Sequence, residues 1–277
     1  MHSVLDIVKT ALAEDIGPGD ITTDNTVDPF AKGKGIIIAK EPLVLAGIDV
    51  AKLVFEQFES PVVFQSSFKD GNFINIGEVV LTIEAKLRTL LTGERTALNF
   101  LQHLSGIATL VRSYVNKTSQ KSTRIVDTRK TTPGLRVLEK YAVRVGGAFN
   151  HRMGLYDGIL IKDNHIAACG SISSAIKSIK SKISHLLKIE VEVSCLHQVK
   201  EALEAGADVI MLDNMDIEMI KKALQLINHK ALVEVSGGVN INNIAEIADT
   251  GVDIISVGAL THSARSVDLS MRIEAVT

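Results

Sequence analysis

Cationic side chains flank a short apolar run near the middle of the chain, within residues 144–166. The run Gly158-Ile159-Leu160-Ile161 is typical of a buried strand, with His151 and Arg152 before it and Lys162 directly after it. Arginine presents a planar fork that binds a carboxylate through two hydrogen bonds, while lysine and protonated histidine add point charge and further donors. This stretch therefore predicts an anion-binding site, and its several cations suit a small substrate with two carboxylates.

Polar residues and glycine turns also follow the other short apolar runs. In chain order they are Arg129 and Lys130, then Glu192, then Asp213, then Ser236-Gly237-Gly238, and finally Gly258-Ala259. Glycine turns that open helices suit a phosphate, because backbone N–H groups and the helix dipole face the ligand. The two acids suit sugar hydroxyls or Mg²⁺, a hard cation that takes one or two carboxylates beside substrate phosphates. One such residue alone is more often a surface or turn residue, so the prediction rests on their occurrence at successive strand ends.

The elements that carry these residues predict a parallel sheet. Helical segments such as 196–205 and 217–227 alternate with six apolar runs, at residues 124–126, 158–161, 188–193, 208–212, 232–235 and 252–257. Right-handed crossovers wind such a series into a barrel or an open sheet, and we favour a barrel. Active sites of such barrels form at the carboxyl ends of the strands, which is where the polar residues lie in this sequence.

The first part of the chain has a different pattern. An amphipathic helix is expected up to Gly17-Pro18-Gly19, followed by a turn-rich connection over residues 20–26. Farther along, a helix is predicted over residues 48–58, and it lies between strands indicated by apolar runs at 35–39, 42–47, 62–64 and 79–83.

A long helix is predicted over residues 87–116. Its Gly93 and Gly106 would each cost about 1 kcal/mol relative to alanine in a helix interior, so we expect a break or a close packing contact at one of them. Just before this helix, residues 70–84 resemble the β-sandwich of lipoyl and biotinyl carriers. They lack a hairpin lysine with the expected neighbours, so a structural β-layer is predicted instead of a carrier.

Composition narrows the possible partners and location. The 277 residues carry 30 Lys and Arg against 32 Asp and Glu, a formal charge of -2, so no global basic field favours nucleic acid or an anionic membrane. No window reaches the roughly 20 apolar residues of a membrane span, and acids interrupt the region that a signal peptide would need. Cys169 and Cys195 have no metal-type spacing and are expected to be core thiols. We therefore expect a cytoplasmic protein.

Taken together, these motifs resemble the quinolinate phosphoribosyltransferases, decarboxylating nicotinate-nucleotide pyrophosphorylases of NAD biosynthesis. The similarity runs nearly from end to end. It is carried by residues 14–17, 19–22, 93–99, 127–136, 140–143, 151–152, 160–165, 190–193, 211–214, 235–238 and 256–261.

The resemblance implies an α/β enzyme with two domains. An N-terminal α/β sandwich would cover residues 1–115, with 262–277 returning to it, and an incomplete α/β barrel would cover 116–261. The enzyme would be a homodimer, with higher assembly left open, in which one subunit's N-terminal domain lies over the other's barrel. The implied substrates are quinolinate and 5-phosphoribosyl 1-pyrophosphate (PRPP), with Mg²⁺ as cofactor.

The resemblance also implies a role for each site residue. Arg129, His151, Arg152 and Lys162 would hold the two quinolinate carboxylates, with Arg95 of the neighbouring subunit. PRPP and its Mg²⁺ would be held by Lys130, Glu192, Asp213, Ser236, Gly237, Gly238, Gly258 and Ala259. The catalytic set is Lys130, Glu192 and Asp213, of which the two acids are the metal candidates. The family usually has three glycines before the His-Arg pair, whereas this chain has Gly146-Gly147-Ala148, and we expect the alanine to be tolerated unless its φ is positive.

Three alternatives follow from the same residues. Lys162 among other cations could form a Schiff base in an aldolase-like lyase. A pyrophosphorylase-like relative linked to molybdenum transport is closer, but loss of the carboxylate-binding cations would favour it, and they are all present. The barrel could also be a non-catalytic metabolite-binding module whose β-layer is an interaction surface.

Overall fold

The computed structural model describes residues 3–275, which form two compact units. Unit 1 contains the chain up to Arg112, residues 131–147, and the chain from Thr261 onward. Unit 2 contains Ser113–Lys130 and Ala148–Leu260. The division differs from the expected domain boundaries chiefly in residues 131–147, which leave the barrel segment of the chain and pack with unit 1.

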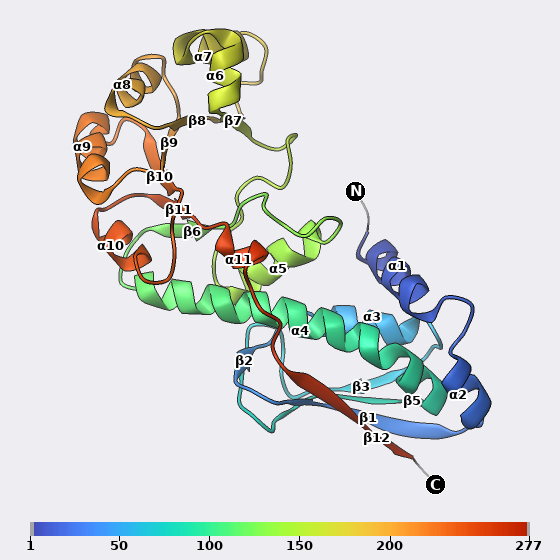
Figure 1. Cartoon of the computed structure of the whole chain (residues 1–277). Coiled ribbons are helices and arrows are strands. Elements are labelled where there is room, and N and C mark those ends of the chain that lie inside the picture. Colours follow the sequence, from blue (N-terminus) through green and yellow to red (C-terminus); the bar gives the residue numbers. More distant parts are fainter. Residues whose placement is uncertain (1–2, 276–277) are drawn as a thin grey trace. The chain divides into compact units, whose positions relative to one another are not determined.

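Unit 1 is built on a four-stranded antiparallel sheet in the order β12-β1-β5-β3. Its strands are β1 (Lys32–Ala39), β3 (Val63–Gln65), β5 (Val79–Lys86) and β12 (Leu269–Ala275), and a second sheet pairs β2 (Leu43–Val44) with β4 (Phe73–Ile74). β12 pairs along β1 from Ala39 to Gly33, so the C-terminal segment returns to the N-terminal part as expected. Figure 1 shows β12, in red, alongside β1, in blue.

The helices of unit 1 match the sequence in most places. They are α1 (Val4–Ile16), α2 (Ile21–Thr26), α3 (Ile48–Glu56), α5 (Arg136–Gly146) and the first part of α4 (Leu87–Thr118). α1 ends at Gly17, whose φ is +54°, as predicted. The turn-rich connection expected over residues 20–26 is wrong, because Asp20 accepts a hydrogen bond from the Thr23 N–H at 2.9 Å and caps α2.

α4 is one continuous helix of 32 residues, so the expected close contacts are present and a break is not. A methyl group on Gly93 would lie 2.9 Å from Phe55, and one on Gly106 would clash with the carbonyl oxygen of Arg265. Both glycines therefore let other parts of unit 1 approach the helix closely. The packing offsets their low helix propensity.

Unit 2 is an open α/β barrel. Its parallel sheet has the order β6-β11-β10-β9-β8-β7, made by β6 (Arg124–Val126), β7 (Ile159–Ile161), β8 (Ile189–Val193), β9 (Val209–Asp213), β10 (Leu232–Ser236) and β11 (Ile254–Ser256). Within the described residues β6 and β7 remain edge strands, so the barrel is incomplete, as the resemblance implied.

Helices cover the outer side of this sheet in Figure 1. They are α6 (Asp163–Cys169), α7 (Ile172–Lys180), α8 (Leu196–Glu204), α9 (Ile217–Ile227) and α10 (Ile244–Asp249), and α11 (Ala259–His262) follows β11. The prediction of core thiols is wrong. Both Cys169, at the end of α6, and Cys195, at the start of α8, are exposed. Among residues 3–275 no helix is long and apolar enough to cross a membrane.

Candidate active site

The strand register explains why the candidate residues of unit 2 share one face of the sheet. Glu192 is paired with Met211, and Met211 with Glu234. Asp213 is paired directly with Ser236. Side chains alternate along a strand, and paired residues point to the same side. One face of the sheet is therefore lined by two residues from each of three strands. These are Glu190 and Glu192 of β8, Met211 and Asp213 of β9, and Glu234 and Ser236 of β10. On each strand the second residue lies nearer the carboxyl end.

Lys162 and Glu192 meet at the carboxyl ends of β7 and β8. The Lys162 Nζ donates to Glu192 Oε2 at 2.7 Å, and the two side chains are 44% and 17% exposed. The backbone N–H of Lys162 donates to Nδ1 of His165 at 2.9 Å, which gives this otherwise unassigned histidine a positioning contact. A substrate anion that binds Lys162 must therefore compete with Glu192 for its ammonium group.

The loops after β9 and β10 are tied together. Asn214 has a φ of +54°, and its backbone N–H donates to the Ser236 carbonyl at 2.9 Å. Its side-chain amide donates to Asp213 Oδ2 at 2.7 Å. Gly237 and Gly238 follow with φ of +86° and +63°, a conformation that L side chains rarely adopt. This turn does not open a helix as expected, because α10 begins only at Ile244, whereas Gly258 does lead directly into α11.

Replacing Gly237 by alanine is expected to destabilise the protein by about 2 kcal/mol, because the methyl group adds a clash to an unfavourable φ. Its Cβ would lie 2.8 Å from the Asn214 backbone nitrogen and still closer to the Asn214 side chain. Gly238→Ala is the matched control. Its Cβ meets nothing within 4 Å, so only the backbone strain of about 1 kcal/mol remains. Urea denaturation of both variants measures the difference, and equal losses would contradict this account of the turn.

Asp127 fixes the segment that carries His151 and Arg152. The Asp127 side chain is fully buried and accepts from the His151 backbone N–H at 2.9 Å and from the Asn150 side chain at 2.6 Å. Phe149 forms a parallel bridge with Val126 of β6. The preceding Ala148 is buried and does not have a positive φ, so the backbone strain considered for this alanine is absent. This short segment occupies the side of the barrel next to the edge strand β6.

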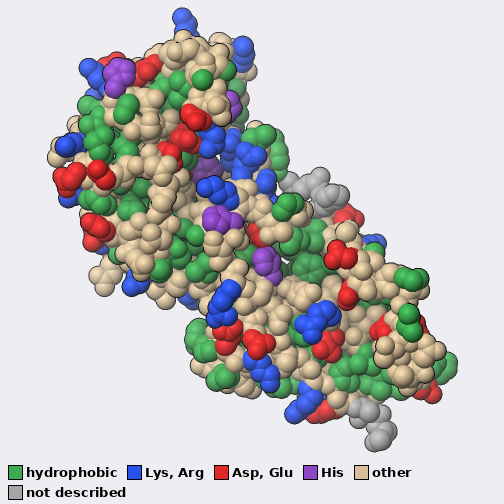
Figure 2. All heavy atoms as spheres, in the orientation of Figure 1, with side chains coloured by type: hydrophobic (Ala, Val, Ile, Leu, Met, Phe, Trp, Pro, Cys, Tyr) green, Lys and Arg blue, Asp and Glu red, His purple; other side chains and the backbone are tan. Residues whose placement is uncertain are grey.

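Arg152 lies near other charged residues of unit 2, namely Arg129, Glu190 and Asp157. Its Nη1 donates to the Gly158 carbonyl at 3.0 Å. Burial, and next the proximity of Arg129, lower its pKa, while Glu190 and Asp157 raise it. Two guanidinium groups close enough to affect each other favour an anion between or beside them. Figure 2 shows Lys and Arg side chains gathered in this part of the molecule, near β7.

His151 lies over two buried acids. Its Nε2 is 3.1 Å from Glu190 Oε2 and 3.7 Å from Glu234 Oε1, so the three groups have the ligand types of a metal site. However, Nδ1 accepts the Arg152 backbone N–H at 2.8 Å. A neutral imidazole with an accepting Nδ1 carries its proton on Nε2, and that nitrogen then has no lone pair for a metal. The hydrogen bonding therefore argues against a metal at this cluster.

Glu192 and Asp213 are the residues that could hold Mg²⁺. Both are partly exposed carboxylates at the carboxyl ends of β8 and β9. Lys162 and Asn214 already occupy one oxygen of each. Two carboxylates are compatible with Mg²⁺, which takes most of its other ligands from water and substrate phosphates. The donor set fits such an ion and would not form a complete protein cage.

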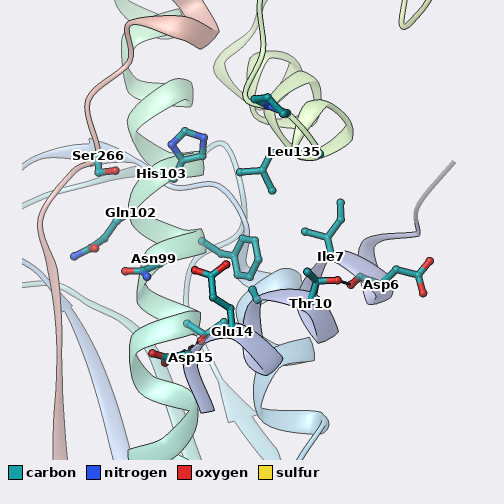
Figure 3. Close-up of a pocket in the computed structure, with 15 residues that line it drawn as sticks. Asp6, Ile7, Thr10, Glu14, Asp15, Asn99, Gln102, His103, Leu135 and Ser266 are labelled. Atoms are coloured by element: carbon teal, nitrogen blue, oxygen red, sulfur yellow. Dashed lines mark hydrogen bonds between the residues drawn. The ribbon is translucent and has the colours of Figure 1, made fainter. Parts of the chain in front are cut away.

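Arg95 belongs to unit 1, where a separate cavity of about 650 Å³ lies between α1 and α4. Arg95 is exposed on α4, one helical turn before Asn99, which lines this cavity. Figure 3 shows Asn99 of α4 near Glu14 and Asp15 of α1, whereas Gln102 points toward the segment that carries Ser266 and donates to the Leu269 carbonyl. The role assigned to Arg95 stays a prediction.

Three acidic residues of unit 2 were missed from the sequence: Asp127, Glu190 and Glu234. Each lies in or directly after an apolar run and resembles an ordinary strand residue. The two-residue period does contain a signal, because Glu190 precedes Glu192 by two residues and Glu234 precedes Ser236 by two. Both buried acids therefore lie beneath candidate site residues on the same face.

Two family models together match most of the chain. The model described as quinolinate phosphoribosyl transferase, N-terminal domain, matches residues 20–105, and the one for the C-terminal domain matches residues 107–272. A probable nicotinate-nucleotide pyrophosphorylase [carboxylating] of Methanocaldococcus jannaschii is 47% identical over 280 residues, covering 97% of this chain and 96% of that protein. The Bacillus subtilis protein of the same name is 45% identical over 260 residues, covering 94% and 90%.

Solved structures of similar proteins have the same fold. The crystal structure of NadC from Streptococcus pyogenes has a TM-score of 0.94 and 45% identity, and the alignment covers 98% of this chain and 96% of that one. The nicotinate-nucleotide pyrophosphorylase from Ehrlichia chaffeensis has a TM-score of 0.94 and 43% identity, with 99% of each chain covered. The similarity therefore extends over both units.

Proposed function

Because the chain belongs to the quinolinate phosphoribosyltransferase family, we propose that its barrel site joins quinolinate to the phosphoribosyl group of PRPP. The chain is accordingly an enzyme, a phosphoribosyltransferase of de novo NAD biosynthesis. The products are nicotinate mononucleotide, pyrophosphate and CO₂. The observation that supports this substrate most directly is the proximity of Arg129 and Arg152, together with Lys162 at the carboxyl end of β7.

Each substrate is assigned to its own part of the site. Quinolinate, which carries two carboxylates, takes Arg129, Arg152 and Lys162, completed by Arg95 of a second subunit, while His151 contacts the backbone N–H of Arg152. The phosphate, ribose and pyrophosphate groups of PRPP take Lys130, Glu192, Asp213, Ser236, Gly237, Gly238, Gly258 and Ala259. In this assignment Lys162 exchanges Glu192 for a substrate carboxylate, and Glu192 becomes available to the sugar or to Mg²⁺.

Mg²⁺ is proposed as the cofactor, held by Glu192 and Asp213 together with PRPP. When bound, it supplies positive charge that stabilises the leaving pyrophosphate. Lys130 is the protein residue assigned to the same task, since its ammonium group adds charge and hydrogen-bond donors beside the pyrophosphate oxygens.

The reaction needs no covalent intermediate with the protein. The ring nitrogen of quinolinate bonds to the ribose carbon as the bond to pyrophosphate breaks, through a cationic sugar that the neighbouring acids Glu192 and Asp213 stabilise. The bond to the adjacent carboxylate then breaks. CO₂ leaves, the electron pair stays on the ring carbon beside the positive nitrogen, and that carbon takes a proton. The protein contributes chiefly by orienting both substrates and excluding water.

A homodimer is proposed because the resemblance to the family implies that Arg95 of one subunit reaches the site of another; Arg95 belongs to unit 1 and the other cations to unit 2. In this arrangement the exposed face of α4 that carries Arg95 would complete a second subunit's site. A cytoplasmic location is also proposed, and it rests on the composition described in the sequence analysis.

The Schiff-base alternative is less well supported. Glu192 Oε2 accepts a hydrogen bond from the Lys162 Nζ at 2.7 Å, and a carbonyl substrate would have to displace this contact to reach the nitrogen. Borohydride treatment with a carbonyl substrate is expected to leave Lys162 unmodified. Covalent trapping on Lys162 would support a lyase in place of the transferase.

The proposed function is tested by turnover. The protein is mixed with quinolinate, PRPP and Mg²⁺, and CO₂ and nicotinate mononucleotide are measured. Nicotinate serves as the control substrate, because it lacks the carboxylate that is lost as CO₂. The expected result is that nicotinate mononucleotide forms with quinolinate as the substrate and does not form with nicotinate. No product from quinolinate, or equal product from nicotinate, would overturn the assignment.

A further inference from the structure

Two buried acids, Glu190 and Glu234, lie inside the barrel beside the half-buried His151 of the proposed quinolinate site. Glu190 and Glu234 are 8% and 2% exposed, and the His151 side chain is 15% exposed. They border a cavity of about 580 Å³ that also touches Arg124, Val209 and Ile254, the first residues of their strands. The cluster therefore lies toward the amino-terminal ends of the strands and not at the strand ends assigned to PRPP.

The hydrogen bonds of His151 determine its protonation. Nδ1 accepts the Arg152 backbone N–H at 2.8 Å and so carries no hydrogen. The ring proton must lie on Nε2, which points at Glu190 Oε2 from 3.1 Å. An imidazolium ion would place a second proton against the Arg152 N–H. With Nδ1 occupied in this way, the ring can carry its one proton on Nε2.

The two acids are not equivalent. Glu190 Oε2 accepts a hydrogen bond from His151 Nε2, whereas Oε1 of each acid is buried without a hydrogen-bond partner among the described residues. Burial, and next the charge of Glu190, raise the pKa of Glu234 to about 8. Two buried carboxylates this close repel each other, so the more buried one holds a proton at neutral pH. Glu190 faces both His151 and Arg152.

From this geometry we propose that Glu190 and Glu234 are positioning residues of the quinolinate site. They hold His151 as a neutral imidazole with its proton on Nε2, and His151 in turn holds the backbone N–H of Arg152. Glu190 contacts Nε2 of His151, and Nδ1 of the same ring accepts the backbone N–H of Arg152, the residue assigned to a substrate carboxylate. Asp127 fixes the same segment from the other side through the His151 N–H.

The tautomer is tested first, in the wild-type protein without substrate. Nitrogen-15 NMR of the labelled protein, with His151→Gln used to assign the signals, distinguishes an Nδ1 that accepts from one that carries a proton. We expect a bare Nδ1 and a protonated Nε2 at neutral pH. An imidazolium, a proton on Nδ1, or a ring shift on adding Zn²⁺ or Mn²⁺ that reports metal binding at Nε2 would each overturn the proposal.

Kinetics then test the positioning, and this part rests on the proposed function. Glu190→Leu removes the acceptor and is expected to raise the KM for quinolinate about tenfold, with the KM for PRPP changed less than threefold. Glu190→Gln keeps an acceptor oxygen and should recover most of the loss. Glu218→Gln, on the exposed face of α9, is the matched control and should behave as wild type.

The outcomes separate the two claims. If wild-type protein does not convert quinolinate, the proposed function fails, while the NMR measurement still decides the state of His151. If quinolinate is converted but Glu190→Leu leaves both the histidine signals and the quinolinate KM unchanged, the positioning role is wrong. Should Glu190→Leu fail to fold, Glu190→Ala provides the same comparison, because it also removes the acceptor that faces His151 Nε2 and should shift the His151 signals.

Discussion

Arg152→Ala is expected to raise the KM for quinolinate by about 100-fold or more while changing the KM for PRPP only slightly. The arginine is partly buried beside Arg129 and Glu190, and it is assigned to a carboxylate of quinolinate. Removing one partner of a buried charged hydrogen bond costs about 2–5 kcal/mol, and each 1.4 kcal/mol is a factor of about ten. Steady-state kinetics with each substrate varied in turn measure the effect.

Two further variants sharpen this test. Arg152→Lys keeps the charge but loses the planar fork, so its KM for quinolinate should lie between those of wild type and Arg152→Ala. Arg272→Ala removes an exposed arginine of β12 that pairs with Glu274, and it should leave both KM values unchanged. Unchanged quinolinate kinetics in Arg152→Ala would refute the assignment of this residue.

Glu234→Gln is expected to stabilise the protein, and to do so more strongly at pH 8 than at pH 5. Burial and Glu190 raise the pKa of Glu234 from 4.5 to about 8 in the folded protein. Between these two values the folded state binds the proton more tightly than the unfolded chain. The free energy of unfolding therefore falls as pH rises through this window, by up to about 1.4 kcal/mol per pH unit, and the loss is complete above the folded pKa.

Glutamine resembles the protonated acid and cannot ionise, so the variant should escape this loss. We expect a gain of about 2–4 kcal/mol at pH 8 and little change at pH 5. Urea denaturation at pH 5, 6.5 and 8 measures it, with Glu218→Gln as a control whose stability should follow that of wild type at each pH. Parallel pH profiles for Glu234→Gln and wild type would show that Glu234 is ionised in the folded protein at neutral pH.

The sequence predicts most elements where local signals and packing agree. α9 occupies the predicted residues 217–227, because Asp216 caps it and its apolar residues recur at helical spacing. α2 was missed because six residues are too few to show a period, although Asp20 is a good cap. The continuity of α4 through Gly93 and Gly106 depends on contacts with Phe55 and Arg265, which are distant in sequence.

The candidate site divides in a similar way. Residues at the ends of strands, such as Lys162 and Asp213, were predictable because parallel strands bring their carboxyl ends together. The hydrogen bonding of His151 was not predictable from the sequence. The sequence suggests a cation, whereas the backbone N–H of Arg152 occupies Nδ1 of the ring, so that nitrogen carries no proton. Buried acids such as Glu234 were also missed, since only the fold shows that their side chains point inward.

The chain passes between the two units at residues 112–113, 130–131, 147–148 and 260–261. α5 lies in the middle excursion, and within unit 1 its Glu139 holds His103 at 2.9 Å while its Gly146 carbonyl accepts from Arg112. Unit 2 is therefore discontinuous in the sequence and cannot be exchanged as a single uninterrupted segment. A chimera that swaps residues 113–260 for those of a relative would also import a foreign α5 into unit 1. Recombination within this family should succeed only where residues 131–147 remain with their own α4.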